Sequence, residues 1–132
     1  MKRVSAICIA GVCFLAIAGT AAAAPKVSVD DVTVAENAGD AVFTVALSKK
    51  PRKDASVRFD TFDASAFAPF DYVSVSKKVR FKADGKRRAK VRVEILDDVA
   101  PEATEAFSVE LSSPNNAALF DGHAQGFITD ND

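Results

Sequence analysis

Three observations along the sequence predict an all-β fold. Apolar and polar residues alternate with a period of two over most of the chain after residue 24, which is the pattern of half-buried strands. Residues that favour turns separate these alternating runs at short intervals, as is typical of connections between strands. The same part of the sequence does not sustain the 3.6-residue period of an amphipathic helix.

Seven strands are expected between residues 25 and 132. Seven short strands in 108 residues, with turns at this spacing, are typical of a seven-stranded immunoglobulin-like antiparallel β-sandwich. The sequence contains no tryptophan, so the domain is not of the antibody type, in which a buried tryptophan packs on a disulfide. The expected strands cover residues 27–35, 40–47, 55–63, 77–82, 87–97, 105–112 and 122–130.

The first expected strand changes face midway. Val27 and Val29 share one face, whereas Val32 and Val34 share the other. A bulge between the two pairs would let the strand leave one sheet and join the second. The other six strands each place their apolar residues on one face, namely Phe43, Val45 and Leu47, then Val57 and Phe59, Val79 and Phe81, Val91, Val93 and Ile95, Phe107, Val109 and Leu111, and finally Ala124, Gly126 and Ile128.

Residues 1–24 have the three-part pattern of a secretory signal peptide. A short positive start precedes an apolar run over Val4–Ala18, and small residues follow, with cleavage expected after Ala22 or Ala24. The apolar run is shorter than the roughly 20 residues of a membrane-spanning helix. The sequence therefore predicts an exported protein, secreted or periplasmic, with one domain at residues 25–132 and no transmembrane anchor in the mature chain.

Cysteine and charge add two constraints on that domain. Both cysteines, Cys8 and Cys13, lie in the predicted leader, so the domain must be held by packing, or by packing and a metal ion. Without the leader, fifteen basic and eighteen acidic residues remain, a net charge of −3. Eight of these acids form a set of their own, and the rest of the surface is mildly basic.

The eight carboxylates lie at the ends of expected strands and in the loops between them. Strand ends and loops of an antiparallel sandwich gather at its two poles, so acids far apart in sequence are expected to converge at one pole. Such groups repel one another unless a cation lies between them. Ca²⁺ binds about six to eight oxygen ligands, whereas zinc prefers histidine or cysteine. The set consists of Glu36, Asp71, Asp97, Asp98, Glu102, Glu105, Asp130 and Asp132.

A simpler interpretation exists for any single member of the set. Acids at strand ends are common in solvated loops, and Asp also caps turns through its own backbone. The density of the set favours an ion, because Asp97, Asp98, Glu102 and Glu105 fall within nine residues. Asp97, Asp98 and Glu102 are the strongest candidate ligands. Asp132 is the weakest, since chain ends fray.

Five short motifs resemble the Calx-beta domain family, in particular a secreted, bacterial-type, single-domain member. The resemblance implies a seven-stranded sandwich that binds Ca²⁺ at one tip, with the eight carboxylates at the ligand positions. It also implies a module for adhesion or protein interaction rather than an enzyme. The motifs are Val34-Ala35-Glu36-Asn37, Phe70-Asp71-Tyr72, Ile95-Leu96-Asp97-Asp98, Glu102-Ala103-Thr104-Glu105-Ala106-Phe107 and Ile128-Thr129-Asp130-Asn131-Asp132.

The sequence departs from the family pattern at three places. The stretch Ala64–Phe70 lacks the glycine-containing turns that usually precede the Asp-Tyr pair. Val99 lies where the strongest calcium binders have a third aspartate, and Asn131 lies where a further acid is often found. Fewer charges lower the affinity for Ca²⁺. We therefore expect one or two ions, bound weakly with a Kd of about 10⁻⁴–10⁻³ M.

Two other features support an alternative, a metal-independent interaction or adhesion module. The basic segment 77–92 holds nine of the fifteen basic residues and is expected to be a hairpin, because Asp84-Gly85 lies between two alternating runs. It either contacts an anionic glycan or membrane surface, or it is a solvated face that protects a sheet edge. No aromatic residue interleaves the basic face of this segment, which argues against nucleic acid.

The second feature is the Phe-rich loop 62–70. Its phenylalanines either cover the end of the core, which is the more common role, or offer an apolar patch to another protein. Catalysis is not expected. His123 is the only histidine and has no nucleophile motif beside it, and a chain with no tryptophan and one tyrosine lacks the aromatics that line a glycosidase cleft.

Overall fold

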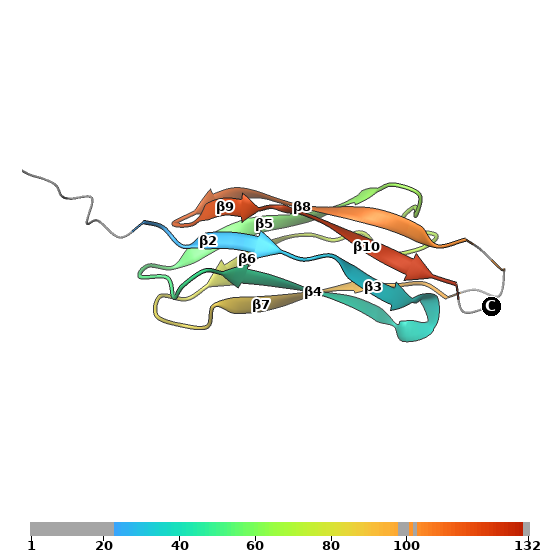
Figure 1. The fold of residues 1–132 in the computed structure, drawn as a ribbon, viewed down its shortest axis with the longest axis horizontal. Coiled ribbons are helices and arrows are strands. Elements are labelled where there is room, and N and C mark those ends of the chain that lie inside the picture. Colours follow the sequence, from blue (N-terminus) through green and yellow to red (C-terminus); the bar gives the residue numbers. More distant parts are fainter. Residues whose placement is uncertain (1–22, 98–100, 102, 131–132) are drawn as a thin grey trace, which may run out of the picture.

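The computed structural model describes residues 23–97, 101 and 103–130, so most of the predicted leader lies outside the described residues. Two sheets pack face to face (Figure 1). Their strand orders are β7-β4-β2-β9 and β3-β10-β8-β5-β6. The bounds are β2 Lys26–Val29, β3 Val32–Ala35, β4 Asp40–Leu47, β5 Ala55–Asp63, β6 Ser76–Phe81, β7 Arg88–Glu94, β8 Glu105–Asn115, β9 Ala118–Asp121 and β10 His123–Thr129, with a 3₁₀ turn, η1, at Glu36–Ala38.

The predicted immunoglobulin-like β-sandwich is confirmed, with nine strands among the described residues instead of seven. The first expected strand is two strands: β2 belongs to the four-stranded sheet and β3 to the five-stranded sheet, as the change of face predicted. β9 was missed because all four of its side chains are exposed, so its sequence carries no alternation. Two strand pairs are parallel, β3 with β10 and β2 with β9. No helix within the described part of the chain is long and apolar enough to cross a membrane.

The predicted hairpin in the basic segment 77–92 is wrong. β6 pairs with β5, and β7 pairs with β4, so the turn between them joins the two sheets instead of closing one ladder. The turn itself forms where expected: the Gly85 N–H donates to the Lys82 carbonyl at 2.9 Å, and Asp84 adopts a φ of 57°. A turn motif predicts where the chain reverses, but it does not determine whether the flanking strands pair.

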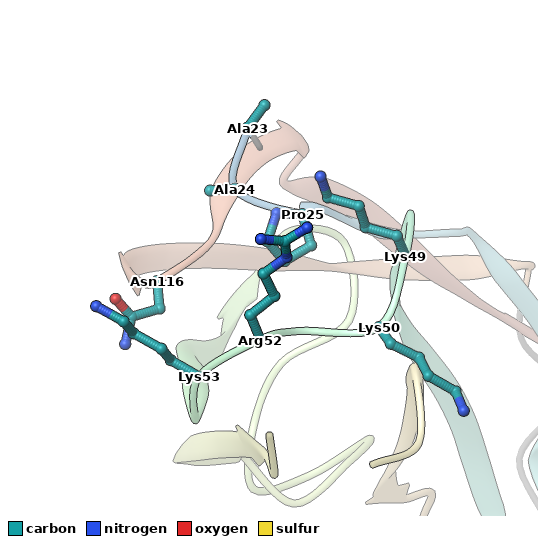
Figure 2. Close-up of a pocket in the computed structure, with 8 residues that line it drawn as sticks. All are labelled: Ala23, Ala24, Pro25, Lys49, Lys50, Arg52, Lys53 and Asn116. Atoms are coloured by element: carbon teal, nitrogen blue, oxygen red, sulfur yellow. The ribbon is translucent and has the colours of Figure 1, made fainter. Parts of the chain in front are cut away.

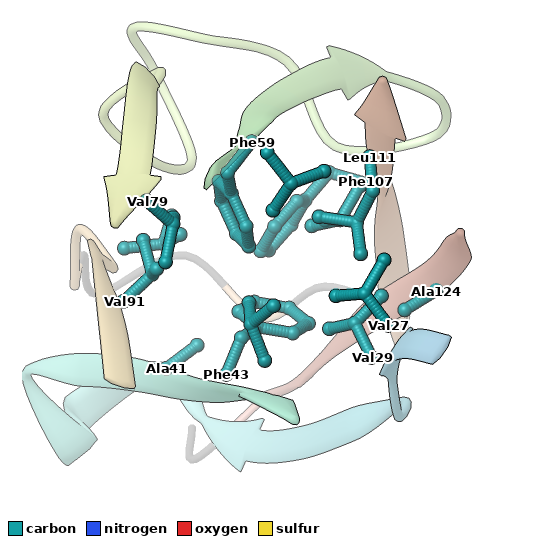
Figure 3. Packing of buried hydrophobic residues seen from close by; sticks show 14 of the residues in the cluster. Val27, Val29, Ala41, Phe43, Phe59, Val79, Val91, Phe107, Leu111 and Ala124 are labelled. Carbon is teal, nitrogen blue, oxygen red and sulfur yellow. The ribbon is translucent and has the colours of Figure 1, made fainter. Parts of the chain in front are cut away.

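Aromatic rings join the two sheets at the centre of the core (Figure 3). Phe43 of β4 meets Phe59 and Phe107 of the opposite sheet edge to face, at centroid distances of 5.7 and 5.9 Å. Tyr72 stacks on Phe107 at 4.4 Å. All four residues are buried. Aromatic pairs of this geometry add about 0.5–1.5 kcal/mol beyond the area that they bury, so this cluster fixes how the sheets face each other.

Gly126 of β10 provides the space for this cluster. It pairs with Phe107 of β8, and a Cβ atom at Gly126 would overlap the Phe107 ring. Glycine is therefore required here by the close approach of a ring, although glycine inside a strand costs backbone entropy.

The substitution Gly126→Ala should destabilise the domain by about 1–3 kcal/mol, because overpacking forces a core ring out of its rotamer. Urea unfolding would measure the change. Gly122→Ala is the matched control: its Cβ would lie 3.4 Å from the nearest atoms, so a change within about 0.5 kcal/mol is expected. Gly126→Ala should also cost less in a Phe107→Leu background. Equal costs in both backgrounds would contradict the role of the ring.

Candidate metal centre

The parallel pairing of β3 with β10 places two of the predicted ligands at one pole. Ala35, the last residue of β3, is the register partner of Thr129, the last residue of β10. Glu36 and Asp130 follow these two residues directly, so both leave adjacent strand ends in the same direction (Figure 1). We call this end of the sandwich the acidic pole. Glu105 begins β8 opposite Ile128 of β10 and lies at the same pole.

Backbone hydrogen bonds bring two further predicted ligands to the acidic pole. The Leu96 N–H donates to the carbonyl of Asp71 at 3.0 Å, so Asp97 follows a residue that is bonded to Asp71. The Ile95 N–H donates to the Gly39 carbonyl at 2.8 Å. Because Gly39 directly follows η1, this bond links the segment of Asp97 to the turn that carries Glu36.

The structure therefore locates five of the eight predicted ligands. Glu36, Asp71, Asp97, Glu105 and Asp130 share the acidic pole, whereas Asp98, Glu102 and Asp132 lie outside the described residues. Within the described part, no three acidic, histidine or cysteine side chains form a cluster that could hold a metal ion. The eight-residue ligand set therefore stays a prediction.

Glu36 is the buried charged residue of the described chain, with 4% of its surface exposed. It opens η1 directly after β3, and it interacts with neighbouring groups. A buried carboxylate is tolerated when it is paired, hydrogen-bonded or bound to a metal. The five described acids at this pole offer oxygen ligands only, which fits a hard cation such as Ca²⁺ and does not fit zinc.

Asp71 organises the loop in which it lies. Its Oδ2 accepts a hydrogen bond from the Phe67 N–H at 2.8 Å, and its own N–H donates to the Phe67 carbonyl at 2.8 Å. The Phe70 N–H donates to the same carbonyl at 3.0 Å. A carboxylate has two oxygens, so Asp71 can hold this loop with one oxygen and an ion with the other.

Asp63, the last residue of β5, was not among the predicted ligands, yet it anchors the same loop. Its Oδ1 accepts hydrogen bonds from the Tyr72 hydroxyl at 2.6 Å and from the Ala68 N–H at 2.9 Å. The bond from Tyr72 is the main cause that lowers the pKa of Asp63 below its usual 3.8. Burial, and then the Asp63 carboxylate, raise the pKa of Tyr72. Asp63 is also a carboxylate at a strand end, so the same sequence criterion could have selected it.

The phenylalanines of the Phe-rich loop 62–70 do not cover the core. Phe62, Phe67 and Phe70 are 50%, 54% and 77% exposed, whereas Ala66 and Tyr72 of the same region are buried. The more common role expected for these phenylalanines is therefore wrong. The small Ala66 and the stacked Tyr72 fill the end of the core and leave the larger rings outside, as an apolar patch at the acidic pole.

The basic segment 77–92 lies on the edge strands β6 and β7 of the two sheets. Its lysines and arginines are exposed, while Val79 and Phe81 are buried beneath them. Arg92 forms an ion pair with Asp40 at 3.6 Å. Charged side chains on an edge strand discourage pairing with another chain, so the edge-protecting role agrees with the position of this segment.

These observations define the class of the protein as an immunoglobulin-like β-sandwich whose N-terminal strand switches sheets and whose acids gather at one pole. Within this class, the chain belongs to the Calx-beta family, because the model of the Calx-beta domain matches residues 20–132.

Solved structures with the same fold agree with this assignment. The apo form of the Calx CBD1 domain is 27% identical with a TM-score of 0.75, and the match covers 82% of this chain and 98% of that one. The calcium binding domain CBD12 of CALX1.1 is 30% identical with a TM-score of 0.71, covering 76% of this chain and 42% of that one. CBD12 from CALX1.2 is 28% identical with a TM-score of 0.75, covering 81% and 44%.

The hydrogen bonds of Asp63 predict a pH-dependent stability. Because the folded state lowers the pKa of Asp63, the charged form stabilises the protein above pH 3.8, and this contribution disappears as the pH falls through the folded-state value. Asp63→Asn should therefore lower Tm at pH 7, and the difference from the parent should narrow below pH 3.8. Thermal melts between pH 2.5 and 7 would measure it. Asp84→Asn at the other pole is the control, and a Tm difference for Asp63→Asn that stays constant with pH would contradict the role of the charge.

Proposed function

We propose that this protein is an exported Ca²⁺-binding module whose ion is held at the acidic pole. The observation that carries the proposal is the convergence of acids from five separate segments, produced by the β3–β10 register and by the backbone bonds at Gly39 and Asp71. Membership of the Calx-beta family and a relative described as a calcium binding domain support it. Export rests on the signal-peptide pattern of residues 1–24.

The ligands of the proposed site are the eight acids selected from the sequence, shared between one or two weakly bound ions. Bound Ca²⁺ would neutralise their mutual repulsion and tie together the strand ends and loops that meet at this pole. A ligand that binds only the folded state stabilises it by RT ln(1 + [L]/Kd). The ion would thus stiffen the pole for adhesion or protein interaction. The ligands are Glu36, Asp71, Asp97, Asp98, Glu102, Glu105, Asp130 and Asp132.

Asp71 connects the proposed ion to a surface that a partner could contact. Its carboxylate already holds Phe67 through the backbone, and both Phe67 and Phe70 are exposed. An ion on Asp71 would restrict this loop further, so that the two rings would be presented in fewer conformations. Pre-organising a contact surface raises affinity by reducing the entropy that binding costs.

Calcium should raise the melting temperature. With a Kd of about 10⁻⁴–10⁻³ M, 10 mM Ca²⁺ should stabilise the fold by about 1.4–2.7 kcal/mol relative to EDTA. The double variant Asp97→Asn, Asp98→Asn should lose this increase. Asp84→Asn, an acid at the opposite pole, should keep it. A double variant that still responds to Ca²⁺ like the parent would show that the ligands lie elsewhere, and a parent without any response would remove the proposal.

The alternative function is metal-independent interaction through the Phe-rich loop 62–70 or the basic segment 77–92. The exposure of Phe67 and Phe70 is the observation that favours the loop, since exposed apolar patches mark interaction sites. The basic segment would contact an anionic glycan or a membrane surface. If the protein is retained on immobilised anionic glycans or vesicles, and if this retention decreases as the salt concentration rises, the basic segment has this role. Absence of retention would exclude the role.

The loop substitutions Phe67→Ser and Phe70→Ser test whether these rings are free for a partner. Because both rings are exposed, the double variant should change the free energy of unfolding by no more than about 0.5 kcal/mol per residue. Chemical denaturation in EDTA would measure it. The buried control Phe59→Ala should cost about 3–5 kcal/mol. A comparable cost for the loop variant would mean that the rings cover the core after all.

A further inference from the structure

A hollow of about 220 Å³ lies at the pole opposite the acids. Three segments form it: the connection between β4 and β5, the start of the described chain, and the turn between β8 and β9 (Figures 1 and 2). We call it the basic hollow. Its lining consists of Ala23, Ala24, Pro25, Lys49, Lys50, Arg52, Lys53 and Asn116.

The basic hollow concentrates uncompensated positive charge. Four cationic residues fall within the five positions 49–53, and no acid lines the cavity. Arg58 pairs with Asp60 and Arg92 with Asp40, and none of these four cations forms an ion pair with another described residue. The acid next in sequence, Asp54, accepts a hydrogen bond from the Ala83 N–H at 2.8 Å. Like charges gathered around one hollow repel one another, and a bound anion would relieve that repulsion.

Backbone hydrogen bonds hold the walls of the basic hollow. Pro51, between the cationic residues, is fully buried, and its carbonyl accepts the Asp84 N–H at 2.8 Å. The Asn116 side-chain amide donates to the Asp54 carbonyl at 2.8 Å. The Ala118 N–H donates to the Pro25 carbonyl at 2.9 Å. The cavity is therefore built into the fold by segments that are distant in sequence.

The four cationic side chains differ in direction. Figure 2 shows Lys49 and Arg52 reaching toward the segment Ala23–Pro25 and Lys53 on the side of Asn116, whereas Lys50 points away from the others. A guanidinium presents a planar fork that binds two oxygens of a phosphate or sulfate group, and an ammonium adds a mobile point charge. Arg52 and Lys49, which reach toward the same segment, thus suit one tetrahedral oxyanion, and Lys53 adds positive charge on the side of Asn116.

We propose that the basic hollow binds a sulfate or phosphate group of an anionic glycan. Its volume is below the roughly 300–1,000 Å³ of sites that enclose a whole drug-sized molecule, so it takes one group of a larger ligand. A second hollow of about 250 Å³ is lined in part by Lys78, Arg80 and Lys82, with Asp54 as its one acid. Asn115 of its lining is the sequence neighbour of Asn116 in the basic hollow. The second hollow takes a second anionic group of the same chain.

The lining of the two hollows contains no exposed aromatic ring, which favours a glycan over nucleic acid. Among the residues that line the two hollows, Phe81 is the one aromatic side chain, and it is buried. Single-stranded nucleic acid binds through bases stacked on exposed aromatics. Lys49 and Arg52 are turned toward the segment that closes the basic hollow (Figure 2), which suits a group that projects from a chain.

Cleavage of the proposed leader would place an additional positive charge at the basic hollow. Cleavage after Ala22 would leave a new α-ammonium group on Ala23, which lines the basic hollow. Cleavage after Ala24 would remove Ala23 and Ala24 from the lining and leave the new charge on Pro25, which also lines it. An α-amino group has a pKa of about 7.7–8.0, so the added charge would be present at neutral pH.

Isothermal titration of the purified protein with a heparin-derived hexasaccharide, in EDTA and low salt, tests the proposal. The double variant Arg52→Gln, Lys53→Gln should weaken binding at least about ten-fold, because it removes charge-assisted hydrogen bonds. The double variant Lys50→Gln, Lys90→Gln also loses two charges, one from the same loop and one from β7, and should weaken binding less than about three-fold in total. Thermal melts of each variant verify folding. No binding by the parent, or equal weakening by the two double variants, would overturn the site.

Further arms of the same experiment identify the source of the oxyanion. Pyrophosphate should bind at least about ten-fold more weakly than the hexasaccharide; equal affinity would overturn the glycan assignment in favour of a small free anion. Tighter binding to anionic vesicles or to single-stranded DNA, lost in the Arg52→Gln, Lys53→Gln variant, would overturn it as well. Asp97→Asn, Asp98→Asn should bind the hexasaccharide like the parent, so the fate of the calcium proposal is decided separately.

Discussion

The transfer of the N-terminal strand from one sheet to the other is the constraint on which the rest of the structure depends. β2 pairs with β4 in the four-stranded sheet, and β3 then pairs in parallel with β10 at the edge of the five-stranded sheet. This crossing ties the two layers together through the backbone. It also sets Glu36 beside Asp130, because the register of β3 determines which residues emerge at the end of β10.

Tyr72 links the core to the acidic pole. Its ring stacks on Phe107, its hydroxyl donates to Asp63, and its backbone bridges to Ile95. The loop that carries Asp71 therefore moves only at the expense of core packing or of a charge-assisted hydrogen bond. A binding pole supported in this way retains its shape without a large core of its own, which suits a domain of this size.

Alternation of apolar residues was sufficient to predict the sandwich and the sheet switch, since burial on one face of a strand leaves a period of two in the sequence. It could not predict β9, whose side chains are all exposed. It also could not predict that β6 and β7 belong to different sheets, because each strand buries one apolar face and the alternation does not indicate which sheet that face belongs to. At the candidate site, strand ends indicated the acids of one pole. The anchoring role of Asp63 depends on the Tyr72 hydroxyl, nine residues away. The basic hollow depends on segments near residues 25, 50 and 116. No pattern in the sequence indicates that these groups lie close together.

The strand β3 near the start of the described chain and the strand β10 near its end run parallel in one ladder, and the described chain starts and ends at opposite poles (Figure 1). Tension between those ends would pull β3 and β10 in opposite directions along their length. All hydrogen bonds of the ladder would then share the load in shear instead of opening one after another. The geometry of this edge therefore makes the domain resistant to stretching, and a cross-link between Glu36 and Asp130 would reinforce the ladder at its far end.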